Sequence, residues 1–364
     1  MPSNTFEEVA ITASVTVVPS KVRKFEEEVD LFDGNTRQVE RLKKTIGFDQ
    51  RRIAESSVTA LDLSFQASLR LLEALKMSPN EIDGILFVTQ TSDHSQPSNA
   101  SLIHKKLGGH SECAAFDINL GCSGYVYGLW VAYGLISSGA CERILLLSGD
   151  TLSQMVHPKD KATAPLFGDA GSASLVEKKI GAGTSWFRIG SNGNGSDALI
   201  VPAGGARLPA TEATAEESID SEGNVRTQEH LHMDGASVFN FSIEVVPNEI
   251  EALLATAQLD VKAVDYFILH QANRYIVQTI GKRLGAERSQ LPIESFGAFG
   301  NVSSASIPAA MAYELGKTLT GDKQHRVILS GFGVGLSWAS CLVSIKAIKC
   351  LKWFEYADNF HKRS

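Results

Sequence analysis

The chain has 364 residues and a formal net charge of −7 at pH 7, with 43% hydrophobic and 21% charged residues. This composition predicts a globular protein of two domains or one large duplicated domain, and it excludes a wholly disordered or fibrous chain. The acidic balance argues against a general nucleic-acid-binding protein, because such proteins present a basic surface.

The five cysteines are scattered and form no CxxC pair, so neither a zinc ribbon nor a disulfide framework is predicted. The N-terminal sequence MPSNTFEEVAITAS lacks a basic region followed by an apolar core, so we expect no signal peptide. Reduced thiols in a cytoplasmic protein are the simplest interpretation.

Short β-rich runs alternate with helical patterns along the chain, which predicts an α/β protein. The helical patterns lie at 61–77 and 243–258, and an uncharged run at 118–140 predicts a buried core helix rather than a membrane span, because Asn119 and several glycines interrupt its apolar character. The expected strands are 84–89, 115–118, 143–148, 173–176, 266–269, 326–330 and 337–345.

Three segments recur at nearly one spacing. The run at 71–88 parallels 253–269, the run ERILLLSG at 142–149 parallels HRVILSGF at 325–332, and Asn119 and Asn301 stand 182 residues apart. A period this long indicates two paired copies of one module rather than a solenoid. We therefore expect an N-terminal half of residues 1–180, a C-terminal half of residues 181–348, and a tail of residues 349–364.

Cys122 is the strongest candidate for a catalytic residue. It lies where a strand passes through a tight turn into the uncharged helix, and a cysteine at a helix start meets free N–H groups and the positive end of the helix dipole. Both features favour the thiolate, which is the nucleophilic form. The other four cysteines are interpreted as ordinary core residues.

Two further polar residues follow apolar segments in the second half. His270 comes directly after the strand at 266–269, at the carboxyl end where α/β sheets bind ligands, although a single histidine there can also be structural. Asn301 could simply cap a turn or helix. By the repeat spacing, however, it lies in the counterpart of the Cys122 segment, so Cys122, His270 and Asn301 are expected to meet in one cleft.

Three other segments complete the pattern. The glycine-rich turn 331–335 could be only a turn, or it could direct a backbone N–H towards an oxyanion. The polar stretch 204–230 predicts a surface excursion or partial disorder. The aromatic and basic tail after Ile345 is interpreted as a short docked helix rather than a membrane anchor. No HExxH motif, Walker motif or GxGxxG motif occurs, and no metal site is predicted.

Over roughly residues 8–346 the chain resembles β-ketoacyl-acyl-carrier-protein synthase III and its thiolase-superfamily relatives. The resemblance rests on GCSGYVYGL around Cys122, LFGDAGSA at 166–173, HQANRYI at 270–276, GNVSSASIP at 300–308 and GFGVGLSW at 331–338. It implies the duplicated five-layer αβαβα fold of that family, usually as a homodimer.

The resemblance also implies a two-stage reaction without a metal or redox cofactor. Cys122 would take an acyl group from coenzyme A or acyl carrier protein. His270 and Asn301 would then stabilise the enolate formed when malonyl-carrier protein loses carbon dioxide. The N–H groups of Cys122 and Val334 would form the oxyanion hole. Gln96, Gly333 and Gly335 would contact substrate, and Lys282 and Arg283 would dock the carrier protein.

Some positions depart from the family pattern. Arg41 and Thr45 stand where housekeeping members have a Trp and an Arg that bind coenzyme A, and Gln96 replaces a Phe that often closes the acyl pocket of the neighbouring subunit. We therefore expect a donor other than acetyl-coenzyme A, and the segment MDGASVF at 233–239 favours a specialised pathway.

Other functions share some of these features. An acyltransferase of the same fold would move the acyl group from Cys122 to an oxygen, nitrogen or sulfur acceptor without decarboxylation. A cysteine hydrolase also uses Cys, His and Asn, but the papain-type C-G-[SA]-C-[WY] run is absent. A non-catalytic partner subunit is disfavoured because all three candidate residues are present.

Overall fold

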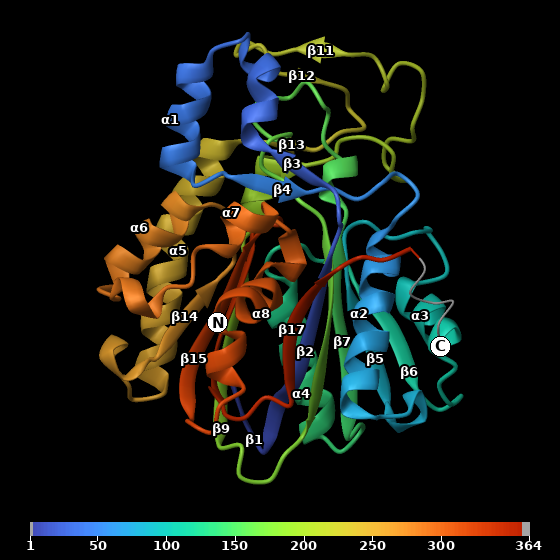
Figure 1. Ribbon diagram of the computed structural model, residues 1–364, viewed down its shortest axis with the longest axis vertical. Coiled ribbons are helices and arrows are strands. Elements are labelled where there is room, and N and C mark those ends of the chain that lie inside the picture. The colour runs from blue at the N-terminus through green and yellow to red at the C-terminus, as the bar shows by residue number, and fades with distance from the viewer. Residues whose placement is uncertain (1–2, 359–364) are drawn as a thin grey trace.

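The computed structural model describes residues 3–358 and contains two large sheets lying side by side (Figure 1). The first sheet has six strands in the order β17-β2-β8-β7-β5-β6, of which β7, β5 and β6 are mutually parallel. Their bounds are β2 Val9–Val18, β5 Gly84–Val88, β6 Ala114–Ile118, β7 Arg143–Asp150, β8 Ala170–Lys178 and β17 Cys350–Glu355. The four strands that the sequence predicted in this half are all present.

The second sheet has five strands in the order β1-β9-β16-β15-β14. Strands β14 and β15 are parallel, and the remaining neighbours are antiparallel. The bounds are β1 Ser3–Glu7, β9 Thr184–Ser191, β14 Tyr266–Leu269, β15 His325–Gly333 and β16 Ser337–Ile345. The strand–helix–strand order β5, α4, β7 in the first half matches β14, α8, β15 in the second, as the internal repeat predicted.

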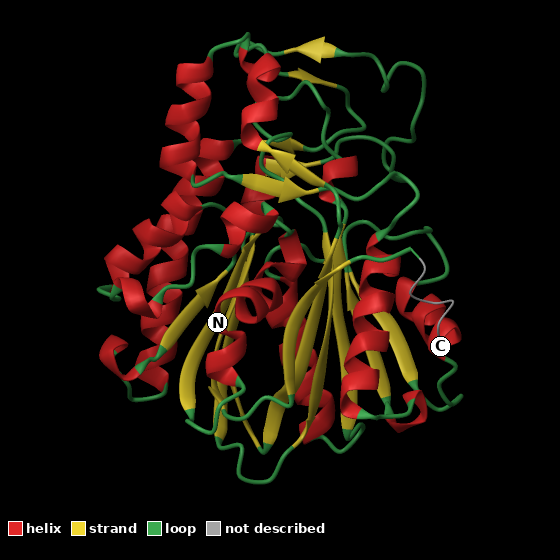
Figure 2. Ribbon diagram, in the orientation of Figure 1, coloured by secondary structure: helices red, strands yellow, loops and turns green. Residues whose placement is uncertain are grey.

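Helices form three layers around the two sheets (Figure 2). Helices α2 and α3 cover the outer face of the first sheet, α4 and α8 lie between the sheets, and α5 and α6 cover the outer face of the second sheet. The helix bounds are α1 Thr36–Ile46, α2 Ala60–Leu75, α3 Asn99–Leu107, α4 Gly124–Ser137, α5 Gly235–Thr256, α6 Arg274–Leu284, α7 Ser295–Phe299 and α8 Ser306–Leu319. The arrangement is the expected five-layer αβαβα fold.

The central layer explains the uncharged run at 118–140. Helix α4 contacts strands of both sheets, and its Tyr125, Leu129 and Tyr133 are fully or almost fully buried in the core between them. A helix enclosed on all sides needs apolar residues around its whole circumference, and such a sequence resembles a membrane span. Within residues 3–358, no helix is long and apolar enough to cross a membrane.

Each end of the described chain adds a strand to the sheet formed mainly by the other half of the sequence. Strand β1 pairs with β9 in the second sheet, and β17 runs parallel to β2 in the first. The expected tail helix is therefore wrong for residues 350–355, and residues 359–364 lie outside the described part. The side chains of this strand alternate between the two faces of the sheet. Leu351 packs into the core between the sheets, whereas Phe354 packs on the opposite face, towards α2.

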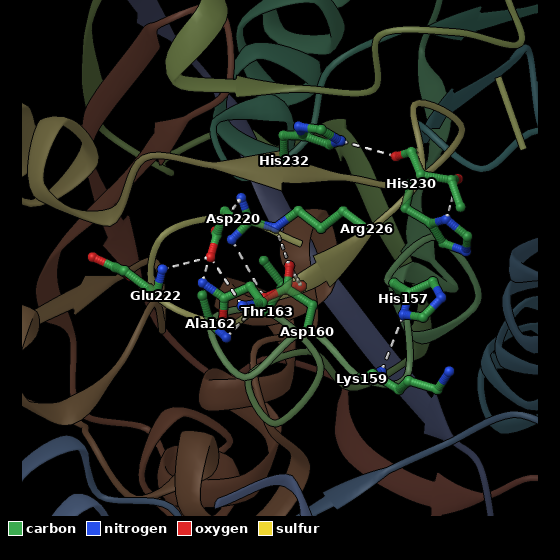
Figure 3. A network of polar contacts seen from close by, with 12 residues as sticks. His157, Lys159, Asp160, Ala162, Thr163, Asp220, Glu222, Arg226, His230 and His232 are labelled. Carbon is green, nitrogen blue, oxygen red and sulfur yellow. Dashed lines mark hydrogen bonds and ion pairs between the residues drawn. The ribbon is translucent and has the colours of Figure 1, made fainter. Parts of the chain in front are cut away.

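The polar stretch 204–230 is an ordered excursion at the end of the molecule that also holds α1 (Figure 1). It contains the two-residue strands β11 Ser218–Ile219 and β12 Val225–Arg226, which pair as a hairpin. Figure 3 shows how Arg226 reaches Asp160, whose side chain is fully buried; Arg226 Nε lies 2.7 Å from Asp160 Oδ2. Of the two expectations for this stretch, the surface excursion is the one observed.

Two more short pairs frame this end of the molecule. Strands β3 Val22–Lys24 and β4 Gln50–Arg52 flank α1, and β10 Leu199–Ile200 and β13 His232–Met233 form the two roots of the excursion.

Candidate active site

Cys122 lies in the turn between β6 and α4, and only 7% of its surface is exposed. Its Sγ is 3.9 Å from Ser303 Oγ, which comes from the second half of the molecule. Gly333 on β15 packs directly against it: a Cβ at Gly333 would lie 2.9 Å from Cys122 Cβ and 3.2 Å from Sγ. A side chain at position 333 would therefore displace the sulfur.

The protonation state of Cys122 differs from the sequence expectation. Burial raises the pKa of the thiol to about 12, and Asp150 adds a smaller effect in the same direction. Cys122 also precedes the N-cap residue of α4, so it is not in the first helical turn. A helix dipole stabilises a charge by at most about 2 kcal/mol, which is less than the desolvation of a buried thiolate costs. The resting sulfur is therefore a thiol.

His270 directly follows β14, and only 2% of its surface is exposed. Its backbone N–H donates to Ser330 O, and its Nδ1 lies 2.7 Å from Ser306 Oγ at the start of α8. Burial lowers the pKa of the imidazole to about 3, so the ring is neutral at pH 7. Phe332 meets the ring edge to face at 5.4 Å. Among residues 3–358, nothing hydrogen-bonds Nε2, which leaves that atom for a substrate.

Asn301 follows α7, and both its backbone N–H and its backbone carbonyl are hydrogen-bonded. Its N–H donates to Leu166 O and its carbonyl accepts from Gly168 N. Its side-chain Oδ1 accepts a 3.0 Å bond from Ser303 N, so the amide is fixed with Nδ2 as the remaining donor.

One cavity of about 250 Å³ brings these residues together. Cys122, His270, Asn301 and Gly333 all line it, so the three residues predicted to meet do so. A nucleophile, a neutral imidazole and an amide donor around one buried space fit acyl-transfer chemistry. The other lining residues are Thr45, Ile46, Leu166, Phe167, Leu199, Met233, Gly235, Val238, Phe239, Ser242, Ala272, Asn273, Tyr275, Ile276 and Phe332.

Sequence and structure comparisons identify the family. The family model for 3-oxoacyl-(acyl-carrier-protein) synthase III matches residues 116–193, and the model for its C-terminal part matches residues 254–345. A β-ketoacyl-(acyl-carrier-protein) synthase III of Clostridioides difficile is 35% identical over 299 residues, covering 82% of this chain and 87% of the relative. The chain belongs to the 3-oxoacyl-(acyl-carrier-protein) synthase III family.

A solved structure agrees with this assignment. The 3-oxoacyl-(acyl-carrier-protein) synthase of Burkholderia xenovorans LB400 superposes with a TM-score of 0.90 at 35% identity, covering 98% of this chain and 99% of that one. A synthase III of Desulfitobacterium hafniense strain Y51 is 32% identical over 338 residues, or 92% of this chain and 97% of the relative. The chain is thus a condensing enzyme of the thiolase superfamily, as its motifs predicted.

The remaining predicted site residues do not line this cavity of the synthase III fold. Val334 follows Gly333 and lines a second cavity that also contains Cys122. Gly335 is in neither lining. Gln96 is exposed in the loop before α3, away from both cavities of its own chain. Lys282 and Arg283 are exposed in the last turn of α6, and Arg283 donates to Ile243 O on α5.

Three residues of the synthase III site were missed by the sequence analysis. Ser303 contacts Cys122 and Ser306 contacts His270, although both belong to the quoted run GNVSSASIP. Asp150 is fully buried at the end of β7, where its carboxylate accepts bonds from Gln90 N, Ser304 N and Ser304 Oγ. Two signals in the sequence could have identified them. The first is the serine-rich run that follows Asn301, and the second is Asp150, which ends an apolar strand.

No group of three or more His, Cys, Asp or Glu side chains within residues 3–358 is arranged to hold a metal ion. The cluster in Figure 3 contains His157, His230 and His232, which share no common acceptor: His230 Nδ1 and His232 Nε2 contact the hydroxyl and the carbonyl of Thr227, and His157 contacts Lys159 N and Glu217.

Proposed function

We propose that this enzyme transfers an acyl group from a thioester to Cys122 and then condenses it with malonyl-acyl carrier protein, with loss of carbon dioxide, to give a 3-oxoacyl product. The observation that carries the proposal is the meeting of Cys122, His270 and Asn301 in one buried cavity. The family membership supports the condensing step, and the relatives are named as synthases that act on acyl carrier protein.

In the acylation step, the resting thiol must lose its proton as it attacks. The neutral His270 accepts this proton at Nε2, and the sulfur forms a bond to the thioester carbonyl carbon. The original carbon–sulfur bond then breaks, and the departing thiolate takes the proton from the imidazolium. The N–H groups of Cys122 and Val334 hold the tetrahedral oxyanion. Neither group donates to another backbone carbonyl within residues 3–358.

In the condensation step, the bond between the malonyl C2 and its carboxylate breaks, and its electron pair remains on the enolate. Asn301 Nδ2 and His270 Nε2–H donate to the enolate oxygen, C2 attacks the acyl carbon, and the Cys122 sulfur leaves as a thiolate, which takes up a proton from water to restore the resting thiol. His270 must now donate where it previously accepted. The Ser306 hydroxyl supports both roles because it can donate to Nδ1 or accept from it. Loss of carbon dioxide supplies the electron pair, so the proposal includes no metal or redox cofactor.

The donor and the carrier protein approach through the mouth of the cavity. Thr45 and Ile46 of α1 line it together with Phe239 and Tyr275, whose rings stack at 5.6 Å. Arg41 is exposed on the same helix and offers no aromatic surface for adenine. This supports delivery of the acyl group by acyl carrier protein rather than by coenzyme A, and hence a donor other than acetyl-coenzyme A, in a specialised pathway. Lys282 and Arg283 would attract the acidic carrier protein.

A homodimer is part of the proposal. Strand β6 is at the open edge of the six-stranded sheet, and Phe116 on it is 40% exposed. An unpaired edge strand with an exposed aromatic residue is a natural site for strand pairing with a second copy. Sedimentation velocity of the wild-type protein and of Phe116→Lys tests this: the wild type should sediment as a dimer and the variant as a monomer. A monomeric wild type would contradict it.

The catalytic roles are tested by separating the two steps. Intact mass after incubation with acyl thioesters should show an adduct on the wild type and on Cys113→Ala and Cys141→Ala, but none on Cys122→Ala. His270→Ala and Asn301→Ala should lose condensation, since removing one oxyanion-type donor costs on the order of 10²–10³ in rate. Asn301→Ala should still acylate. Acylation of Cys122→Ala, or near-normal condensation by both other variants, would overturn the assignment.

A further inference from the structure

A second cavity of about 210 Å³ shares Cys122, Phe167 and Leu199 with the first. Most of its wall is apolar, being formed by Leu152, Met155, Phe167, Leu199, Ile200, Val201, Leu231 and Val334. Two carboxamides, Gln90 and Asn119, interrupt this wall.

The backbone of Gln90 is held firmly in place. Its N–H donates a 2.7 Å bond to the buried carboxylate of Asp150. One residue further on, Thr91 Oγ1 accepts from Thr151 N at 3.0 Å. The loop after β5 is thus hydrogen-bonded to the end of β7. These bonds fix the backbone position from which the Gln90 side chain reaches the cavity.

The Gln90 carboxamide lies against the residue that precedes the nucleophile. A Cβ at Gly121 would be 2.0 Å from Gln90 Oε1, so the amide occupies the space that a side chain at position 121 would fill. The same Cβ would be 3.2 Å from Val334 Cγ1. The amide is therefore beside the part of the cavity nearest Cys122, where the first carbons of a Cys122-bound acyl group must lie.

The amide also has no hydrogen-bond partner from the protein. Across residues 3–358, no side chain or backbone group hydrogen-bonds the Gln90 or Asn119 carboxamide. Asn119 is exposed and remains hydrated, whereas Gln90 is half-buried. A carboxamide offers two donors and an acceptor oxygen. A pure hydrocarbon chain in this cavity would displace its water and leave Gln90 unpaired, which disfavours binding.

We infer that Gln90 makes the second cavity selective for acyl groups that carry a hydrogen-bonding oxygen, such as a hydroxyl or keto group, within the first few carbons from the thioester. The inference rests on the proposed acylation of Cys122 and names the class of acyl donor. A site built to hydrogen-bond a substrate group discriminates against the analogue that lacks it, because the protein group is then left without a partner.

The test compares two donors of the same length on the full-length protein. Hexanoyl and 3-hydroxyhexanoyl thioesters compete for Cys122, each presented on coenzyme A and on acyl carrier protein, and intact mass gives the ratio of the two adducts. The wild type should favour the hydroxylated donor by about tenfold or more. Gln90→Met, which is similar in length, should bring the ratio close to one.

The control is Gln324→Met, in the exposed loop before β15, which should keep the wild-type ratio. Gln90→Glu retains acceptor oxygens for the substrate hydroxyl and should keep part of the preference, which guards against a general effect of substitution. A wild-type ratio near one, or an unchanged ratio in Gln90→Met, would overturn the inference while leaving the proposed function intact. Absence of any adduct with all four donors would instead contradict the proposed function.

Discussion

Burial sets the chemistry of the two residues that exchange a proton in this site. It raises the pKa of Cys122 and lowers that of His270, so both are neutral at pH 7 rather than a thiolate–imidazolium pair. Each shift has the same cause, since a low-dielectric environment disfavours the charged form of either group. The nucleophile is therefore generated only when a substrate carbonyl is present to accept the negative charge.

The resting thiol gives a definite pH dependence. Because the pKa of Cys122 is about 12, its thiolate fraction should rise about tenfold per pH unit between pH 7 and pH 10. The rate of iodoacetamide alkylation at Cys122, measured by peptide mass spectrometry, should rise without levelling over this range. A plateau near neutral pH would show a preformed thiolate and contradict the assignment.

Ser306 should act as a positioning residue for His270. Ser306→Ala leaves the buried Nδ1 without its partner, so kcat for condensation should fall by about tenfold with little change in KM for the malonyl thioester. The matched control is Ser68→Ala, which removes another buried serine hydroxyl, one bonded only to Ser64 O within α2. Equal activity of the two variants would exclude the role.

At the scale of elements, residues distant in sequence complete both sheets. Strand β17 covers β2, which would otherwise be the edge of the first sheet, and it packs against α8 through Leu351 and Trp353. The Trp353 ring meets Phe299 edge to face at 5.3 Å, and Phe299 lies one residue before the Gly300–Asn301 turn. The terminal strand thus supports a wall of the active site.

Removing one β17 contact should therefore lower global stability. Leu351→Ala should reduce the free energy of unfolding by about 2–5 kcal/mol, the usual cost for a buried leucine. Leu208→Ala, at an exposed position in the excursion, should change it by less than about 0.5 kcal/mol. Urea denaturation gives both values, and similar values for the two variants would show that β17 is dispensable.

The excursion should depend on the buried pair between Arg226 and Asp160. Removing one partner of a buried pair typically costs about 3–5 kcal/mol, because the other charge stays buried without compensation. Arg226→Ala should therefore open the segment 204–230 and speed its cleavage by thermolysin, whereas Arg207→Ala at an exposed position should not. Unchanged cleavage rates in Arg226→Ala would contradict this role.

At the scale of the whole molecule, the site exists only because two homologous halves face each other. Cys122 comes from the first half, and His270, Asn301, Ser303 and Ser306 come from the second. Asp150 ties the halves together by accepting bonds from Gln90 and from Ser304. The sequence predicted that Cys122, His270 and Asn301 would meet in one cleft, and all three line one cavity.

Other features could not be read from the sequence because they depend on distant neighbours. The sequences of residues 3–7 and 350–355 do not reveal which strands they pair with. Strands β1 and β17 pair with β9 and β2, which are distant in the sequence. The thiolate expectation failed for a similar reason: the helix start is visible in the sequence, whereas the desolvation of Cys122 by the second half is not. The contacts of Ser303 and Ser306 likewise depend on the tertiary packing.

The central claim is that an acyl group on Cys122 is consumed by decarboxylative condensation. The most direct measurement loads Cys122 with an acyl group, removes the donor, adds malonyl-acyl carrier protein, and follows the protein mass together with carbon dioxide and carrier-bound product. The account predicts loss of the adduct with one carbon dioxide and one 3-oxoacyl-carrier protein for each acyl group consumed. Loss of the adduct without carbon dioxide, or with the acyl group unchanged on another acceptor, would contradict it.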